Sequence, residues 1–338
     1  MASMQAWQIP SRSGDILTNL TLNTVPQPLP RSLKPTDILI KVISASLNPA
    51  DHKVPEMGPH ARLLMSFPKT PAMDLAGQVV AVGSSVTDIS TGDHVVARVD
   101  PLKRPGGLSE YVIAQRDGYA KITGAVAWDV AAAVPTAGLT ALQNIQPYVK
   151  AGDKIFINSG SGGTGTYMIQ IAKLLGCHVT VSCSTQKAHL CKALGADDII
   201  DYKTTDVIQE LTKRGRVFNL ILDNVGDSPP NFYTRSAAVM LPDAVYVYVS
   251  AGKVFGDAIK AGYHWLWPSF LGGGANKVVM YITKSKRTDL ETLAGWLNEG
   301  KLTSMIDKTF EFGDAKGAFE YLKKGSTAGK IVLHVGQA

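Results

Sequence analysis

The sequence predicts an α/β protein in which a β-rich region is followed by a doubly wound parallel sheet. Up to residue 122, short runs rich in Val, Ile and Gly alternate with turn residues, as strands do. From residue 123, helical and strand patterns alternate, which is typical of parallel strands joined by crossover helices. The chain has 338 residues, more than one hydrophobic core usually serves, so two domains are expected.

The β-rich region contains four strand-like runs, each bounded by turn residues. They occupy residues 37–48, 76–86, 92–100 and 109–114. Because no comparable helical pattern interrupts them, we expect residues 1–122 to form a compact, mostly β domain.

The second region supplies both kinds of element. Helical patterns lie at 127–145, 166–176 and 187–195, and strand patterns at 154–160, 178–184, 197–202, 218–226, 244–250 and 276–283. Residues 123–283 are therefore expected to form a parallel sheet with helices on both faces. The tail, residues 284–338, has two helical patterns and a closing strand, and we expect it to return to the first domain.

A glycine-rich turn follows the strand at 154–160 and precedes the helix at 166–176. It satisfies G-x-G-x-x-G, whose glycines allow a tight turn, a close approach of backbone to a pyrophosphate, and close packing of helix on strand. The helix start offers unpaired N–H groups and positive potential. In this setting the pattern favours a dinucleotide site over a purely structural turn. Its residues are Gly160, Ser161, Gly162, Gly163, Thr164 and Gly165.

The next strand indicates which dinucleotide binds. An NAD site is expected to place a carboxylate about 20 residues after the glycines, yet the segment 183–187 carries none. Ser184 offers a hydrogen bond and Lys187 a positive charge, which suits the 2′-phosphate of NADPH. Alternatively, Ser184 caps the helix at 187–195 and Lys187 is solvated; both roles can coexist.

Composition excludes several other classes of protein. The net charge is +6, but Lys and Arg are scattered, which favours a solvated surface with a local phosphate site over nucleic-acid binding. Cys177, Cys183 and Cys191 lack metal spacing and are expected to be small buried residues. No run approaches the roughly 20 apolar residues of a membrane span, and the first residues lack a secretory signal. We expect a cytoplasmic protein, with an organelle left open.

Taken in order, several segments resemble the medium-chain dehydrogenase/reductases, and among them the zinc-free quinone oxidoreductase-like branch. They are SLNPADHK, PAMDLAGQVVAVGSSV, GDHVVA, VPTAGLTAL, SGSGGTGTYMIQIAK, LGADDIIDYK, LILDNVGD and AGKIVL. The chain is similar to chloroplast-envelope quinone oxidoreductase homologues, to reticulon-4-interacting mitochondrial reductases and to fungal trans-acting enoyl reductases. The resemblance implies a GroES-like substrate domain, a Rossmann domain and an NADPH-dependent reductase with its site between them.

The resemblance also implies roles for particular residues. Tyr202 would join Ser184 and Lys187 around the 2′-phosphate. Zinc alcohol dehydrogenases have a cysteine where this chain has Asn48, and a G-H-E motif where it has residues 72–74. Because Asn and Met are poor zinc ligands, we expect no metal.

Without zinc, hydrogen bonds must polarise the acceptor of the hydride. Asn48 is the first candidate, since the matching family residue faces the nicotinamide; as part of Asn-Pro it can also simply form a turn. Lys53 is a candidate donor or proton source, or a solvated lysine. Thr136 falls where the family brings a helix start near the nicotinamide.

The ends of two later strands are expected to line the cofactor through their backbone, because ligands of open α/β sheets sit at the carboxyl ends of strands. The residues are Asn224, Val225, Ser250 and Ala251. The aromatic segment 261–274 is expected to form a pocket wall, a dimer surface or a buried helix.

Three functions remain open from the sequence. The first is zinc-independent, NADPH-dependent reduction of an enone, enal or quinone, and the second is enoyl reduction of a polyketide bound to an acyl carrier protein. The third is a non-catalytic NADPH-binding protein, because a fold does not fix a function. Either a monomer or a homodimer is compatible with the sequence.

Overall fold

The computed structural model describes residues 2–10, 14–226, 228–249 and 276–337. The chain divides by packing into two compact units, Met1–Leu139 with Lys284–Ala338 as unit 1, and Thr140–Thr283 as unit 2. The boundary falls within helix α5 (Pro135–Ile145). The predicted domain limits, 1–122, 123–283 and 284–338, stay a prediction.

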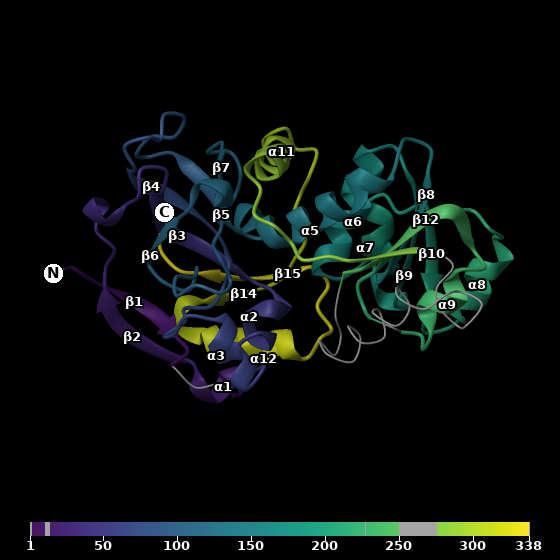
Figure 1. Ribbon diagram of the computed structural model, residues 1–338, viewed down its shortest axis with the longest axis horizontal. Helices are drawn as coiled ribbons and strands as arrows, with labels where there is room; N and C mark the ends of the chain where they lie inside the picture. Colours follow the sequence, from purple (N-terminus) through teal and green to yellow (C-terminus); the bar gives the residue numbers. More distant parts are fainter. Residues whose placement is uncertain (1, 11–13, 227, 250–275, 338) are drawn as a thin grey trace. The chain divides into compact units, whose positions relative to one another are not determined.

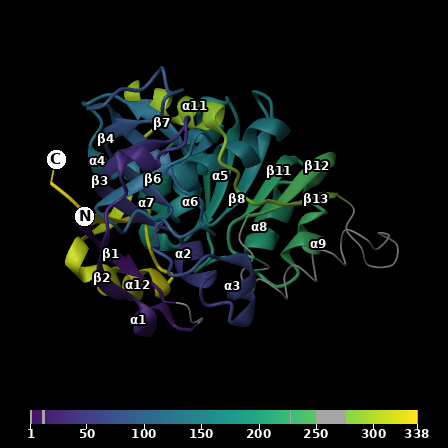
Figure 2. The same cartoon turned by 60° about the vertical axis from the view of Figure 1, so that its left-hand side comes forward.

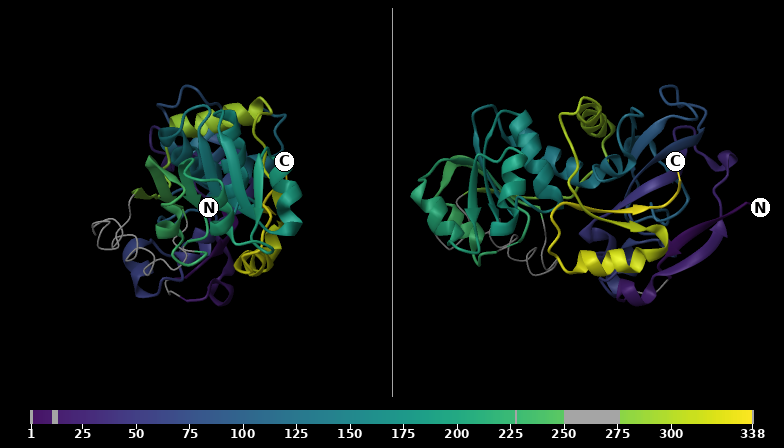
Figure 3. Two further views of the ribbon diagram at one scale, coloured as in Figure 1. Left: turned by 90° about the vertical axis from the view of Figure 1, so that its right-hand side faces the viewer. Right: turned by 180° about the vertical axis from the view of Figure 1, so that it is seen from behind.

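Unit 1 is built on a seven-stranded sheet whose strands come from both ends of the chain (Figure 1). The order is β14-β15-β3-β4-β5-β7, with β6 paired to β3. The late strand β15 pairs antiparallel with β3, so the yellow end of the chain lies beside early purple strands in Figure 3. The strands are β3 (Ile38–Leu47), β4 (Asp74–Val82), β5 (His94–Arg98), β6 (Tyr111–Ala114), β7 (Tyr119–Ile122), β14 (Ile306–Glu311) and β15 (Lys330–His334).

Short helices and a two-stranded sheet, β1 (Ser3–Gln8) with β2 (Thr21–Pro26), complete unit 1. Figure 2 shows the first helix, α1, close to α12, and Lys323 of α12 donates to Asp15 at the start of α1 at 2.8 Å. The helices are α1 (Ile16–Asn19), α2 (Pro49–Lys53), α3 (Pro59–Leu64), α4 (Trp128–Ala132), α11 (Arg287–Asn298) and α12 (Ala315–Lys323), with 3-10 turns at η1 (Pro30–Ser32), η2 (Arg116–Gly118) and η6 (Phe312–Asp314).

Unit 2 is a six-stranded sheet in the order β10-β9-β8-β11-β12-β13, with every pair parallel. This is the doubly wound order in which the strand sequence reverses beside the first strand. Figure 1 shows α6 and α7 on one side of the sheet, and α8 and α9 on the other. The elements are β8 (Lys154–Asn158), α6 (Gly163–Leu174), β9 (His178–Cys183), α7 (Ala188–Ala193), β10 (Asp198–Asp201), α8 (Val207–Lys213), β11 (Phe218–Asp223), α9 (Phe232–Ser236), β12 (Met240–Tyr248) and β13 (Lys277–Met280), with 3-10 turns η3 (Gln146–Tyr148) and η4 (Thr185–Lys187).

The predicted fold class is confirmed, a β-rich unit joined to a doubly wound parallel sheet. One predicted helix, 127–145, is wrong as a single element, because the chain forms α4 and then α5 with a break before Pro135. Proline lacks the N–H that a continuous helix needs and disfavours a helical residue before it. The three cysteines are free and buried, as predicted.

Candidate functional site

The glycine turn, residues 160–165, lies between β8 and α6 at the carboxyl end of the parallel sheet. Gly160 N–H donates to Ser182 O at 2.9 Å, and Ser159 before it has a left-handed φ of 67°. Gly162, the N-cap residue of α6, has no side chain with which to cap the helix. The N–H groups of the first turn therefore receive no capping bond from Gly162, and a phosphate is the ligand that a helix N-terminus favours.

The three glycines of the pattern differ in what surrounds them. A Cβ at Gly165 would come within 2.3 Å of Ser159 O, and one at Gly160 within 2.8 Å of the Val181 side chain. Among the residues that the structure describes, a Cβ at Gly162 would meet only the Ser159 hydroxyl, at 3.6 Å. Gly160 and Gly165 are thus required by the packing of the unit itself. Within the described residues no such contact requires a glycine at Gly162, the position where the pattern expects the close approach of a ligand.

The three residues predicted to bind the 2′-phosphate follow two neighbouring parallel strands, with Ser184 directly after β9, Lys187 at the end of η4, and Tyr202 directly after β10. Asp201, the last residue of β10, pairs with Cys183, the last of β9, so Ser184 and Tyr202 follow adjacent strand ends. Ser184 precedes η4 but its side chain makes no capping bond, so the alternative of a capping serine receives no support. Tyr202 is 50% exposed.

A hydrogen-bonded network fixes the turn that follows β11. The Asp223 carboxylate accepts N–H bonds from Val225 at 3.0 Å and Gly226 at 3.1 Å, and a bond from the Asn158 amide at 2.9 Å. Tyr246 donates its hydroxyl to the same carboxylate at 2.9 Å. The sequence placed Asn224 and Val225 at this edge but did not reveal that Asp223 holds the turn.

The side chain of Asn224 carries a buried polar atom without a partner. Its Oδ1 has no hydrogen bond within the described part of the chain, while its Nδ2 lies 3.4 Å from Ser159 O. An unpaired buried acceptor beside the glycine turn fits a site that a ligand completes. Ser250 and Ala251, and the aromatic segment 261–274, lie outside the described residues.

A second polar cluster lies in unit 1, and we name it the Asp74 cluster. Its members are Asn48, Asp51, Asp74, Arg98, Thr136 and Lys330, which the structure shows to be buried except for the half-buried Thr136. Asp74 is fully buried, and its Oδ1 accepts from the backbone N–H of Thr136 at 3.0 Å and from the Thr136 hydroxyl at 2.6 Å. Arg98 Nε donates to the same hydroxyl at 3.0 Å.

Two side chains of opposite charge hold the two amide atoms of Asn48. Its Nδ2 donates to Asp74 Oδ2 at 2.8 Å, and its Oδ1 accepts from Lys330 Nζ at 2.6 Å. The Asn48 backbone N–H donates to Asp51 at 2.7 Å. Two of the predicted catalytic residues, Asn48 and Thr136, are therefore brought together by one carboxylate.

Burial shifts the pKa of two members of this cluster, Asp51 and Lys330. Removal from water, reinforced by the neighbouring Asp74, raises the pKa of Asp51 to about 6. Burial also lowers the pKa of Lys330, while Asp74 and Asp51 oppose that shift. The ion pair between Lys330 Nζ and Asp74 Oδ2 spans 3.7 Å.

Lys53, the third predicted catalytic residue, is the last residue of α2 and is half-buried. Asn48 precedes this helix, so the two side chains share one short segment. His52, between them, contacts Glu56 at 3.1 Å. Sequence reasoning missed Asp74, Arg98 and Lys330 because they lie on strands far apart in the chain, and no local pattern connects them.

Asn48 and Met73, at the positions where zinc alcohol dehydrogenases have zinc ligands, do not suit a cation. Lys330 places an ammonium 2.6 Å from Asn48 Oδ1, and Met73 is buried. Across the described residues, no group of three or more His, Cys, Asp or Glu side chains is arranged to hold a metal ion. The expectation of no metal stays a prediction.

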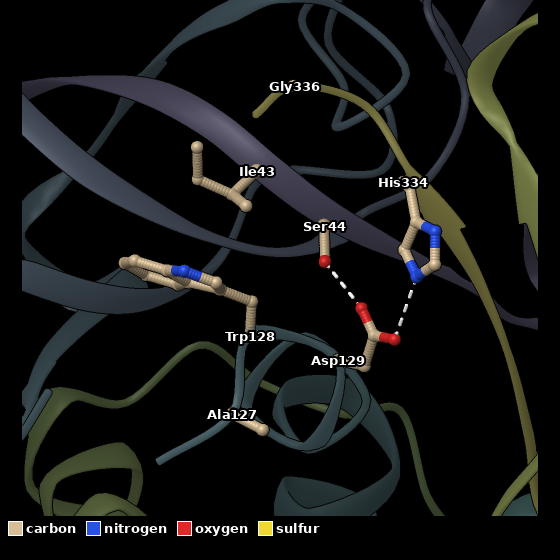
Figure 4. Close-up of a pocket in the computed structure, with 7 residues that line it drawn as sticks. All are labelled: Ile43, Ser44, Ala127, Trp128, Asp129, His334 and Gly336. Atoms are coloured by element: carbon tan, nitrogen blue, oxygen red, sulfur yellow. Dashed lines mark hydrogen bonds and ion pairs between the residues drawn. The ribbon is translucent and has the colours of Figure 1, made fainter. Parts of the chain in front are cut away.

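Unit 1 also has a hollow of about 270 Å³ that no member of the Asp74 cluster lines. Figure 4 shows the Trp128 ring and Ile43 on one side of it and a line of polar side chains on the other. Ser44 donates to Asp129 at 2.6 Å, and His334 Nε2 lies 2.9 Å from the same carboxylate. None of the predicted site residues that the structure describes lines this hollow.

Comparison with known proteins identifies the class. The profile of the alcohol dehydrogenase GroES-like domain matches residues 34–127, and that of the zinc-binding dehydrogenases matches residues 194–333. Together with the parallel sheet and its glycine turn, these matches define a two-domain oxidoreductase.

Three relatives extend the match over nearly the whole chain. The trans-enoyl reductase pgmF of Aspergillus terreus is 42% identical, over 99% of this chain and 97% of that protein. The human mitochondrial NAD(P)H oxidoreductase RTN4IP1 is 29% identical, over 98% of this chain and 89% of that one. The solved quinone oxidoreductase of Coxiella burnetii is 29% identical, with a TM-score of 0.82 over 99% of this chain and 100% of that one.

The chain belongs to the medium-chain dehydrogenase/reductase superfamily, in its quinone oxidoreductase-like branch. The resemblance predicted from the sequence motifs is thereby confirmed. Among the helices that the structure describes, none is both long and apolar enough to cross a bilayer.

Proposed function

We propose that this oxidoreductase uses NADPH to reduce an activated C=C bond, next to a carbonyl group, or a quinone. The observation that carries this proposal is the glycine turn, where Gly162, the N-cap residue of α6, has no close contact among the described residues that would require a glycine. The relatives named as an enoyl reductase, an NAD(P)H oxidoreductase and a quinone oxidoreductase support the same class of reaction.

Unit 2 would hold the dinucleotide. The glycine turn would bind the pyrophosphate, Ser184, Lys187 and Tyr202 the 2′-phosphate, and Asn224 and Val225 the neighbouring edge of the sheet. When bound, NADPH supplies a hydride. The absence of a carboxylate in the segment 183–187 supports NADPH over NADH, since an acid there would repel a phosphate.

Unit 1 would contribute the polar groups that act on the acceptor. Asn48 can donate an N–H to a carbonyl oxygen, which gains negative charge as the hydride arrives. Lys53, at the end of α2, can deliver a proton, because an ammonium is an acid. Thr136 has its hydroxyl between Asp74 and Arg98, which favours a role in holding the cluster together.

A second candidate is favoured by one comparison. The 42% identical relative is named a trans-enoyl reductase, which supports an enoyl group carried on an acyl carrier protein as the substrate. The chemistry would be the same, and only the delivery of the substrate would differ. A cytoplasmic location and a monomeric or homodimeric state stay predictions.

The test is oxidation of NADPH, followed at 340 nm, with a panel of enals, enones and quinones and with a crotonyl group on a carrier protein. Every assay is repeated with NADH. We expect turnover with NADPH and an enone or quinone, and a kcat/KM at least about tenfold lower with NADH, because one charge contact contributes about 1.4 kcal/mol or more.

The outcomes separate the candidates. Turnover only with the carrier-bound substrate supports the second candidate. Binding of NADPH without oxidation by any acceptor supports a non-catalytic protein and contradicts the proposal. A clear preference for NADH contradicts the assignment of Ser184, Lys187 and Tyr202.

A further inference from the structure

Lys330 is a buried lysine that the reaction proposed above does not use. It is 3% exposed and begins β15, directly after Gly329, whose φ is 112°. A Cβ at Gly329 would come within 2.2 Å of Met305 O, and the Lys330 N–H donates to that same oxygen at 2.7 Å. The backbone therefore fixes where the Lys330 side chain enters unit 1.

The groups around the Lys330 ammonium are hydrogen-bond acceptors. Nζ donates to Leu47 O at 3.0 Å and to Asn48 Oδ1 at 2.6 Å, and it pairs with Asp74 Oδ2 at 3.7 Å. A lysine ammonium has three donors and no acceptor, so only the oxygen of the Asn48 amide can face it.

Asp74 imposes the matching constraint from the other side. An ionised carboxylate only accepts hydrogen bonds, so only the nitrogen of the Asn48 amide can face it, and Nδ2 lies 2.8 Å from Asp74 Oδ2. An asparagine amide is otherwise free to exchange its two ends. Lys330 and Asp74 together permit one orientation.

We infer that Lys330 is a positioning residue, which holds the Asn48 amide so that a ligand meets an N–H donor and never the amide oxygen. One hydrogen of Nδ2 has no partner in the part of the chain that the structure describes. That hydrogen suits a carbonyl oxygen, either of the unsaturated substrate or of the nicotinamide amide. This role rests on the function proposed above.

The role is tested by a double-mutant cycle on kcat/KM with Lys330→Met and Asn48→Ala. If Lys330 acts through Asn48, each single variant loses roughly 100-fold, as removal of an oriented donor does, and the double variant is no slower than the slower single variant. If the two single losses in kcat/KM multiply in the double variant, the inference is overturned. A Lys330→Met variant whose kcat/KM is within twofold of wild type overturns it as well. A rise in KM for NADPH assigns the hydrogen to the nicotinamide amide, and a fall in kcat assigns it to the substrate.

Two further variants separate positioning from folding. Lys69→Met removes another buried lysine of unit 1, which is 4% exposed and bonds to Lys103 O and Pro105 O instead of to Asn48. It is expected to lower Tm but to change kcat/KM less than threefold; a loss as large as that of Lys330→Met contradicts the inference.

Lys330→Met leaves the Asp74 charge unpaired, so it can fail to fold. A double variant with Asp74→Asn and Lys330→Met has no unpaired charge at these two positions. It still removes the constraint on the Asn48 amide, which can then exchange its oxygen and nitrogen ends. A folded pair with kcat/KM lowered at least tenfold supports the inference, and a folded pair with wild-type kcat/KM overturns it. Wild-type enzyme without any turnover contradicts the proposed function itself, which is a different result.

Discussion

At the scale of single residues, the same residue type serves different purposes at neighbouring positions. Gly165 and Gly160 leave room for the protein's own backbone and side chains, whereas a Cβ at Gly162 would have no close contact with the described residues. Likewise Lys330 lies among acceptors in the core, while Lys53 lies half-buried at a helix end. What each residue contacts, and not its type, decides its role.

The glycine pair gives a direct test of this distinction. Gly165→Ala places a Cβ 2.3 Å from Ser159 O, so we expect a loss of about 1–3 kcal/mol in the free energy of unfolding. Gly162→Ala, the matched control, is expected to change that free energy by less than about 0.5 kcal/mol and to weaken NADPH binding roughly tenfold. Urea unfolding and a fluorescence titration measure the two quantities. Equal destabilisation by both variants would contradict the assignment.

His334 gives a pH-dependent test, at the hollow shown in Figure 4. Its partner Asp129, and more weakly Glu311, raise the pKa of this histidine. A raised pKa in the folded state adds stability that is full below the unfolded pKa, about 6.5, and is lost as the pH rises through the folded pKa. Wild type should therefore lose stability relative to His334→Gln as the pH rises from about 6 to 9. Parallel stability curves for the two proteins over that interval would refute this.

At the scale of elements, the sequence revealed periodic segments but not their partners. The strand 154–160 was predicted from a short contiguous apolar run and the strand 178–184 from alternating apolar residues, and β8 and β9 match them. The β14 strand, Ile306–Glu311, was not predicted, because Ile306 and Phe310 are its only apolar residues and they give no strand pattern. The single helix at 127–145 was wrong because a proline in the middle outweighed a continuous apolar pattern.

The amphipathic helix α12 tests how much one element contributes to unit 1. Phe319 is fully buried in the same core as Ile40 and Leu75, while its neighbour Glu320 is exposed. We expect Phe319→Ala to lower the free energy of unfolding by about 3–5 kcal/mol, and Glu320→Ala by less than about 0.5 kcal/mol. Similar values for the two variants in urea unfolding would show that α12 does not pack as described.

At the scale of the whole molecule, the sequence predicted a fold class and a cofactor pattern, but not the Asp74 cluster. The glycine turn is local, so its spacing is visible in a single segment of sequence. Asn48, Asp74 and Lys330 come together only because β15 pairs with β3 and β3 pairs with β4. Such long-range pairing leaves no signature in local periodicity, which is why the buried lysine was not foreseen.

Binding of the dinucleotide should stabilise the folded chain. A ligand present at 100 times its Kd adds about 2.7 kcal/mol to the free energy of unfolding. We expect NADPH to raise Tm more than NADH does at equal concentration, and we expect Lys187→Ala to remove most of that difference. Lys192→Ala is the control, because that lysine bonds to Asp197 O, away from the turn after β9. Equal shifts with both dinucleotides in wild type would contradict the 2′-phosphate assignment.

The central claim is that this chain transfers a hydride from NADPH to an activated acceptor. NADPH deuterated at C4, prepared separately on each face, is incubated with the enzyme and an enone, and the product is analysed by mass spectrometry and NMR. We predict that deuterium from one face appears at the β-carbon of the reduced product. Consumption of the enone without deuterium from either face, or no reduction of any enone or quinone, would contradict the claim.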